Sequence, residues 1–290
     1  MRLSHWGIVA ANPATACGGL FCQSTPVNQQ AERIIFTINS NATITAYVQI
    51  NYTGSASDFS WVVPVPAVPE VDVAEIDSFD QLSSLTAPVF IAPCRPSYLD
   101  QRLEHEFSDR RMASMAAAGD AVEVLAQGTA GPYGFEVVRS DDPDALIRWL
   151  RENSYRITPA MELLVHEYTR EGALFLAMRL QEKGFSAQDI QPVMVTCSGS
   201  VPSIPIRLTA VAANPNMSVL TRVFADTQAA PGNYANPVVD ARNLRNDPFQ
   251  ANGTNYLRLL DLTVDLSGGQ ALVTEYGADH DQLLDRQATH

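Results

Sequence analysis

Lysine is almost absent from this sequence. Lys183 is the single lysine, although the chain has 19 basic residues in all. Schiff-base chemistry, or a phosphate cradle built on an ammonium group, would therefore depend on that one residue. It stands in a Gln-Glu-Lys-Gly stretch typical of the exposed end of an element. We interpret the shortage as a coding bias of the source genome and not as a functional feature.

The common catalytic motifs are also missing. The sequence has no G-x-S-x-G elbow, no G-x-G-x-x-G, no phosphate loop and no H-E-x-x-H. The run His166-Glu-Tyr-Thr-Arg170 places a cation where zinc needs its second ligand. The run His105-Glu-Phe-Ser-Asp109 spaces two potential ligands one turn apart, but its charged surroundings favour a solvated helix face. We therefore favour a non-catalytic role over an enzymatic one.

Positive charge is in short supply, with 32 acidic residues, 19 basic residues and a net charge of −13. Such a surface repels nucleic acid and anionic membranes unless basic residues gather on one face. The densest basic run is only Arg110-Arg111. No run of about 18 apolar residues occurs, so we expect this chain not to span a membrane. The composition therefore predicts no nucleic-acid partner.

Four cysteines are present, and none of them forms a C-x-x-C pair. An even count fits two disulfides, for which three connectivities exist. We favour a local Cys17–Cys22 bond and a long-range Cys94–Cys197 bond. The alternative is four buried free thiols in a cytosolic protein.

The start of the chain has the ingredients of an export signal. The basic Arg2 is followed by an apolar patch over residues 6–11 and by Ala14-Thr-Ala16, a small-residue cleavage site. We expect cleavage before Cys17 and an extracytoplasmic location: periplasm, cell surface or medium. A lipoprotein would instead acylate Cys17, but Ala14 stands where such sites usually carry leucine.

The pattern of apolar residues predicts an α+β fold with mainly antiparallel sheets, in which a β-rich amino-terminal lobe precedes a mixed second lobe. Strands are expected at 34–38, 43–52, 59–63, 122–125, 135–138, 174–180, 193–196, 206–211, 219–224 and 271–276. Helices are expected after Asp142-Pro143, after Pro159 and at 255–266. The predicted divisions are an export remnant at 1–16, a β-rich lobe at 17–94, a helical connector at 95–118, an α+β lobe at 119–277 and a polar tail at 278–290.

Three prolines, Pro64, Pro66 and Pro69, follow the third expected strand. Proline cannot donate to a sheet ladder, so this stretch is predicted to form an edge strand or a polyproline-like segment. A proline-rich ligand for a partner domain is the alternative.

Two stretches rich in Asp and Asn side chains, at 240–252 and 279–285, are the remaining candidates for a functional site. Calcium prefers such ligands, but neither stretch has the spacing of an EF-hand, and turn formation explains them as well. Cys197-Ser-Gly-Ser200 has no neighbouring histidine, and Trp149 falls on an apolar helix face. We therefore predict no cofactor, and keep calcium as the weaker alternative. Its candidate ligands are Asp240, Asn243, Asn246, Asp247 and Asn252 in one stretch, and Asp279, Asp281 and Asp285 in the other.

Seven short blocks lie at 17–22, 47–54, 59–66, 131–137, 146–153, 205–210 and 272–277. In this order they resemble an uncharacterised bacterial family catalogued as domain of unknown function 2330. The resemblance implies a bacterial, exported protein, and it implies no activity, cofactor or catalytic residue. We expect a structural or binding component of the cell envelope or of a secreted assembly, with other proteins as partners. A hydrolase using carboxylates or a metal, and a calcium-dependent adhesion module, are the alternatives.

Overall fold

The computed structural model describes residues 2–5, 28–53, 60–87, 122–181, 191–211, 213–250, 253–279 and 282. The expected connector at 95–118, His105 and Lys183 lie outside these ranges. Within them, no helix is both long enough and apolar enough to cross a membrane.

A long hairpin forms the centre of the larger sheet. Strand β2 (Asn28–Ile38) pairs antiparallel with β3 (Thr43–Thr53), and the turn is closed by a hydrogen bond from the Asn39 amide to the Thr43 carbonyl at 2.9 Å. The sequence predicted both strands. Alternation along β3 places Ala46, Val48 and Ile50 on the buried face, also as predicted.

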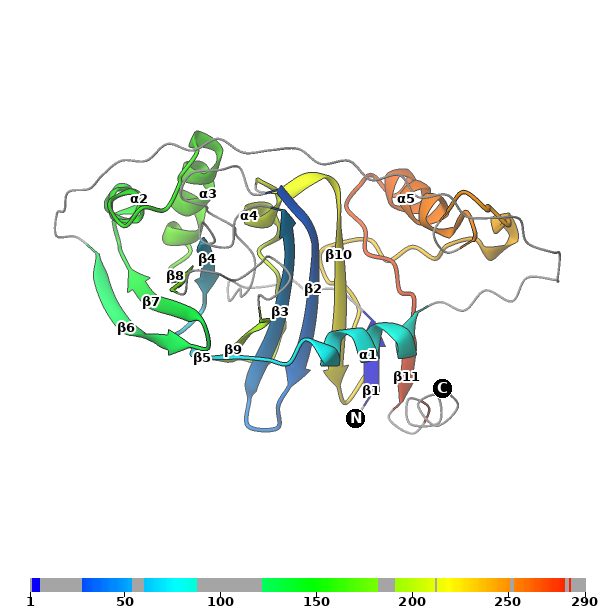
Figure 1. Ribbon diagram of the computed structural model, residues 1–290, viewed down its shortest axis with the longest axis horizontal. Helices are drawn as coiled ribbons and strands as arrows, with labels where there is room; N and C mark the ends of the chain where they lie inside the picture. The colour runs from blue at the N-terminus through cyan, green and yellow to red at the C-terminus, as the bar shows by residue number, and fades with distance from the viewer. Residues whose placement is uncertain are drawn as a thin grey trace.

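Five more strands complete this seven-stranded sheet (Figure 1). The order is β11-β1-β10-β2-β3-β9-β5. The β10–β2 pair is parallel and every other pair is antiparallel. The additional strands are β1 (Arg2–His5), β5 (Glu70–Val73), β9 (Val193–Ser198), β10 (Ala213–Ala225) and β11 (Gly277–Asp279).

The second sheet is antiparallel, with the order β4-β8-β7-β6. Pro64 lies in β4, an edge strand, so the edge position predicted for this proline is confirmed. Gly131 turns the β6–β7 hairpin with a positive φ of 53°, and an added Cβ would lie 2.8 Å from Val73. The strands are β4 (Ser60–Val65), β6 (Glu123–Ala130), β7 (Tyr133–Arg139) and β8 (Leu174–Leu180).

Helices α2 (Pro143–Glu152) and α3 (Pro159–Arg170) begin where the sequence predicts. The Asp142 side chain accepts a hydrogen bond from the Asp144 amide, and Thr158 caps α3 by accepting from the Met161 amide. Each cap satisfies one of the free amides of a first helical turn. Proline follows both caps, where its missing amide costs nothing.

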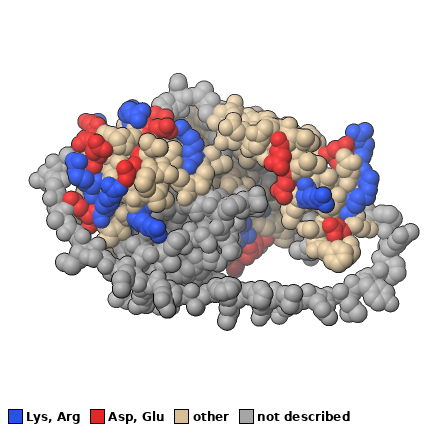
Figure 2. Space-filling view, turned by 90° about the horizontal axis from the view of Figure 1, so that it is seen from above, with Lys and Arg blue, Asp and Glu red and all other residues tan. Residues whose placement is uncertain are grey.

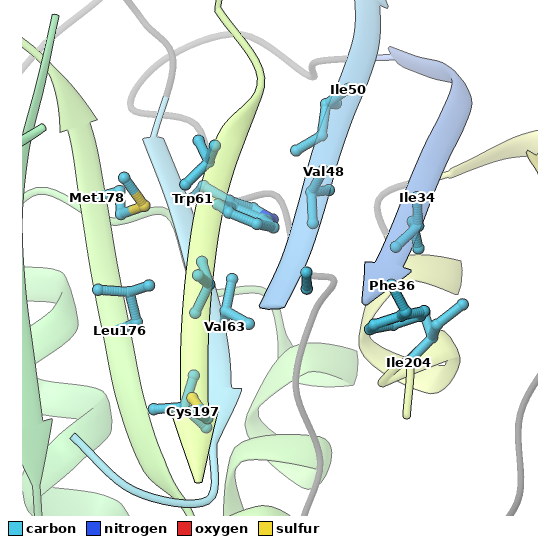
Figure 3. Packing of buried hydrophobic residues seen from close by; sticks show 14 of the residues in the cluster. Ile34, Phe36, Val48, Ile50, Trp61, Val63, Leu176, Met178, Cys197 and Ile204 are labelled. Atoms are coloured by element: carbon cyan, nitrogen blue, oxygen red, sulfur yellow. The ribbon is translucent and has the colours of Figure 1, made fainter. Parts of the chain in front are cut away.

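The two sheets pack face to face around one core, and helices cover the outer side of the smaller sheet. In β4, Trp61, Val63 and Val65 point into the core between the sheets, while Val62 points toward the helices. Figure 3 shows Trp61 extending toward the strand that carries Val48 and Ile50. Both sheets combine strands from before and after residues 95–118. The fold is α+β, and this core joins the two halves of the chain.

Two predicted strands are wrong. Residues 206–210 form a short helix, α4 (Ile206–Ala210). Helical spacing lets Leu208 and Val211 pack together against the helical core, while Ile206 packs against the core between the sheets. A strand would have placed Ile206 and Leu208 on one face.

Residues 271–276 form a single bridge at Ala271 and no ladder. Two contacts hold this segment in place. Leu272 packs on the core between the sheets, and the Glu275 carboxylate accepts a hydrogen bond from the Tyr256 hydroxyl. The preceding helix α5 (Tyr256–Leu266) agrees with the prediction, and Tyr256 is its buried residue.

The cap of α2 gives a direct test of this local structure. Asp142→Ala should lower the free energy of unfolding by about 1 kcal/mol, because the Asp144 amide loses its acceptor. Asp142→Asn keeps an acceptor and should remain close to wild type. Asp141→Ala is the matched control, because the Asp141 carboxylate is 90% exposed. Urea unfolding measures all three, and equal losses in Asp141→Ala and Asp142→Ala would contradict the capping role.

Candidate functional site

The outer face of the large sheet carries two arginines beneath helix α1 (Asp77–Thr86). Arg33 of β2 lies opposite Leu220 of β10, and Arg222 lies opposite Ile35. The two arginines are therefore two positions apart on the same face of neighbouring strands. Figure 1 shows α1 crossing in front of β2 and β10. The parallel pairing of β2 with β10 brings these residues together.

Arg222 is 1% exposed and has an incomplete set of partners. Its Nε donates to Thr86 Oγ1 at 3.3 Å, and its Nη2 donates to Ser83 Oγ at 3.0 Å. Nη1 has no hydrogen-bond partner, and Arg222 forms no ion pair with any carboxylate that the structure describes. Burying an unpaired cation costs several kcal/mol, so this arrangement needs an explanation.

Arg33 is better satisfied. Its Nε donates to Gln49 Oε1 at 2.6 Å, and its Nη1 lies 2.7 Å from Asp80 Oδ1. The same Nη1 is 3.3 Å from Ser83 Oγ, and the guanidinium lies 5.5 Å from the ring centre of Phe79. Ser83 Oγ thus accepts from both arginines and joins them into one cluster.

Helix α1 orients its hydroxyls for this purpose. Ser83 Oγ donates to the Phe79 carbonyl at 2.8 Å, and Thr86 Oγ1 donates to the Leu82 carbonyl at 2.6 Å. Each hydroxyl donates its proton to a carbonyl of its own helix, so its lone pairs can accept hydrogen bonds from the guanidinium groups. The last turn of α1 has no basic residue of its own. The arginines from the sheet place positive charge at the negative end of the helix dipole.

The charges of this cluster perturb one another. Burial, and then the nearby Arg33, lower the pKa of Arg222 to about 10, while Glu275 acts in the opposite direction. Tyr256 donates its hydroxyl proton to Glu275 Oε1 at 2.6 Å, and burial together with this bond raises the pKa of Tyr256. Glu275, in the segment that follows α5, therefore acts on the cluster through its charge. Chemically it offers guanidinium donors, which suit the binding of an anion.

The predicted calcium ligands at 240–247 have turn and capping contacts in the structure. Asp240 accepts from the Arg242 amide and pairs with the Arg242 guanidinium at 2.9 Å, which lowers the pKa of Asp240. Asp247 Oδ1 accepts from the Phe249 amide. Asn243 Nδ2 donates to Asp240 Oδ2 at 3.3 Å.

Asp279 is not brought near this group; its carboxylate accepts from the Gln282 amide. Asn252, Asp281 and Asp285 lie outside the described ranges. Among the residues that the structure describes, no group of three histidine, cysteine or acidic side chains is arranged to hold a metal ion. Calcium binding by these stretches stays the weaker alternative.

Cys197 is a buried free thiol at the end of β9. Its predicted partner Cys94 lies outside the described residues, so the Cys94–Cys197 disulfide stays a prediction. Its side chain packs in the apolar core between the sheets (Figure 3). Burial raises the pKa of Cys197 to about 11, which makes the thiol a poor nucleophile. Cys17, Cys22 and Cys94 lie in parts of the chain that are not described.

The remaining candidates have structural contacts. His166 Nε2 lies 3.0 Å from Asp144 Oδ1, across α3 and α2. Trp149 stacks on Tyr155 with ring centres 6.4 Å apart and packs against the helical core, as its apolar helix face predicted. Trp61 is buried in the core between the sheets and lines no groove.

The carboxy-terminal segment exposes a group of large apolar side chains. Its helix α5 lies at the opposite end of the molecule from α2 and α3 (Figure 1). Seen from above, charged groups gather at the α2–α3 end and again at the α5 end, and an uncharged area lies between them (Figure 2). The exposed residues are Val238 at 83%, Phe249 at 95%, Leu257 at 51%, Leu262 at 50% and Leu266 at 80%.

Sequence reasoning missed the arginine cluster, including helix α1 itself. One signal was available: Arg222 stands inside the mainly apolar run Val219–Phe224, in a strand otherwise suited to burial. An arginine at such a position predicts either a polar cover or a bound partner. The sequence did not indicate which segment covers it.

Removing one hydroxyl should test the cluster. Ser83→Ala deprives two guanidinium groups of an acceptor, so we expect the free energy of unfolding to fall by about 2 kcal/mol. Ser84→Ala is the matched control, because Ser84 Oγ bonds only the Gln81 carbonyl among the contacts described and is exposed. That variant should stay within about 0.5 kcal/mol of wild type. Equal effects in chemical unfolding would contradict the role of Ser83.

The buried thiol predicts a pH dependence of stability. The pKa of Cys197 is raised in the folded protein, so the unfolded chain ionises first as the pH rises past about 9. The stability that this thiol contributes is complete below pH 9 and is lost by about pH 11. Cys197→Ala should therefore give a flatter fall in the free energy of unfolding over this range. Slopes that match wild type would contradict a buried free thiol.

No curated protein and no solved structure shows a significant match to this chain. A family described as an uncharacterized protein conserved in bacteria, domain of unknown function 2330, matches residues 11–280. Of the elements that the structure describes, the match includes every strand except β1 and each α-helix, and it confirms the family that the ordered sequence blocks resemble. The chain belongs to this bacterial family.

Proposed function

We propose that this protein is exported and acts as a non-catalytic component that binds other proteins of the bacterial envelope or of a secreted assembly. The exposure of large apolar side chains on the carboxy-terminal segment carries this proposal. Soluble monomers rarely expose such groups together, and apolar surface of this kind commonly marks a protein–protein contact.

Helix α5 supplies the most regular part of this surface. Leu262 and Leu266 are one turn apart and therefore neighbours on one helix face, 50% and 80% exposed. Elsewhere around the helix, Tyr256 is buried. Burying one leucine side chain in a partner contributes about 1.5–3 kcal/mol. These two adjacent leucines can thus form the centre of an interface.

The same segment has a fixed backbone, which favours binding without a large ordering cost. Asn255 is the link: its Oδ1 accepts from the Arg245 amide at 2.7 Å and its Nδ2 donates to the Asn243 carbonyl at 3.2 Å. Ala235 bridges to Ala271 at the base of the segment. A surface that is already ordered loses less conformational entropy when a partner binds.

Export rests on the amino-terminal pattern before Cys17 and on no structural observation. Strand β1 (Arg2–His5) lies within the predicted leader and pairs with both β10 and β11. Cleavage before Cys17 would therefore remove the strand between β10 and β11. This makes the mature amino terminus informative about both location and fold.

The assembly should be visible when the protein is extracted gently from its own cells after mild crosslinking. We expect it to migrate well above the 31.6 kDa of a single chain, together with defined partner proteins. Phe249→Ser combined with Leu266→Gln should release it as a monomer. Leu163→Gln is the control, because Leu163 is 69% exposed on α3, away from α5. Wild-type protein that migrates as a monomer would overturn the proposal.

The same preparation also tests export. Mass spectrometry of the amino terminus should find Cys17 as the first residue, in an extracytoplasmic fraction. An intact Met1 in a cytosolic fraction would contradict export while leaving the binding surface to be judged by the assembly experiment.

A further inference from the structure

We propose that Arg222 and Arg33 bind a small monovalent anion, chloride in the first instance, between helix α1 and the large sheet. This inference is independent of the proposed function, since it concerns a different part of the molecule. It begins from Arg222 Nη1, a donor that is fully buried and has no partner in the described part of the chain.

The charge of the cluster indicates how much negative charge is required. Two guanidinium groups meet at Ser83 Oγ, and the carboxylate in direct contact with them is Asp80, which pairs with Arg33. Glu275 acts on Arg222 electrostatically but forms no ion pair with it. The directly contacting groups thus carry one unbalanced positive charge, which a single monovalent anion would neutralise.

The surrounding groups cannot supply that balance themselves. The Ser83 and Thr86 hydroxyls are neutral, and they engage Nη2 and Nε of Arg222. The carboxyl end of α1 offers partial negative charge on the same side. None of these contacts reaches Nη1, whose two N–H groups would each gain from an acceptor. An anion beside Nη1 would satisfy these donors and offset the desolvation of the charge.

Burial favours a small ion over a larger one. Arg222 is 1% exposed, and Asp80 at the edge of the cluster has a side chain that is 65% exposed. A phosphate or sulfate would bring two charges into a site that lacks one, and would need more donors than Nη1 provides. A halide needs few directed contacts. Phosphate and sulfate are therefore outcomes that the experiment must separate from chloride.

Thermal unfolding of the full chain at constant ionic strength tests the proposal. Replacing sodium gluconate with sodium chloride should raise the Tm by a few degrees, because an ion that binds only the folded state stabilises it. Arg222→Met should abolish this response, and Arg148→Met, which removes an exposed guanidinium near Asp142, should keep it. Equal Tm values in gluconate and chloride, or a larger rise in sulfate, would overturn a monovalent site.

A second measurement covers the case in which Arg222→Met does not fold. Crystals of the wild-type protein soaked in bromide should show an anomalous peak within hydrogen-bonding distance of Arg222 Nη1. Absence of that peak beside an ordered Arg222 would contradict the proposal. Neither result depends on the α5 surface, so failure here leaves the assembly proposal standing.

Discussion

The packing of the two sheets against each other is the constraint on which the rest of the fold depends. Each strand that faces this core alternates, so every second residue is committed to burial between the sheets. Val48 of β3, Trp61 of β4 and Leu176 of β8 meet there although they come from distant parts of the chain. The core can form only when both halves of the chain are in place, because each sheet contains strands from both halves. The outer face of each sheet is covered by different helices.

The two covers differ in chemistry. The smaller sheet is covered by α2, α3 and α4 through an apolar interface that includes Leu146, Val165 and Phe175. The larger sheet meets α1 through Phe79 and through arginines held by hydroxyls. An apolar cover gains stability from burial alone, whereas a buried guanidinium must be compensated group by group. The incomplete compensation at Arg222 therefore identifies this contact as the place where the fold departs from simple packing.

Sequence reasoning succeeded where the signal was local. Alternation in residues 43–52 and the Asp142-Pro143 cap fix a strand and a helix start through interactions within a few residues. It failed for residues 206–211, where a short apolar run has no decisive period and the two cores select a helix. It could not find the arginine cluster, because Arg33 and Arg222 are neighbours only through the parallel β2–β10 pairing. Parallel pairing between distant strands has no local sequence signature.

The described contacts divide the polar and apolar groups into those that are engaged within the fold and those that are not. The Ser83 and Thr86 hydroxyls donate to helix carbonyls, and the Cys197 thiol lies in an apolar core, so their reactive groups are engaged or protonated. Arg222, by contrast, keeps unused donors, and Leu266 and Phe249 keep unused apolar surface. Hydrogen bonds made by such donors and burial of such apolar area both contribute to the free energy of binding. Both are held by ordered backbone, so a ligand or partner would find them already in position.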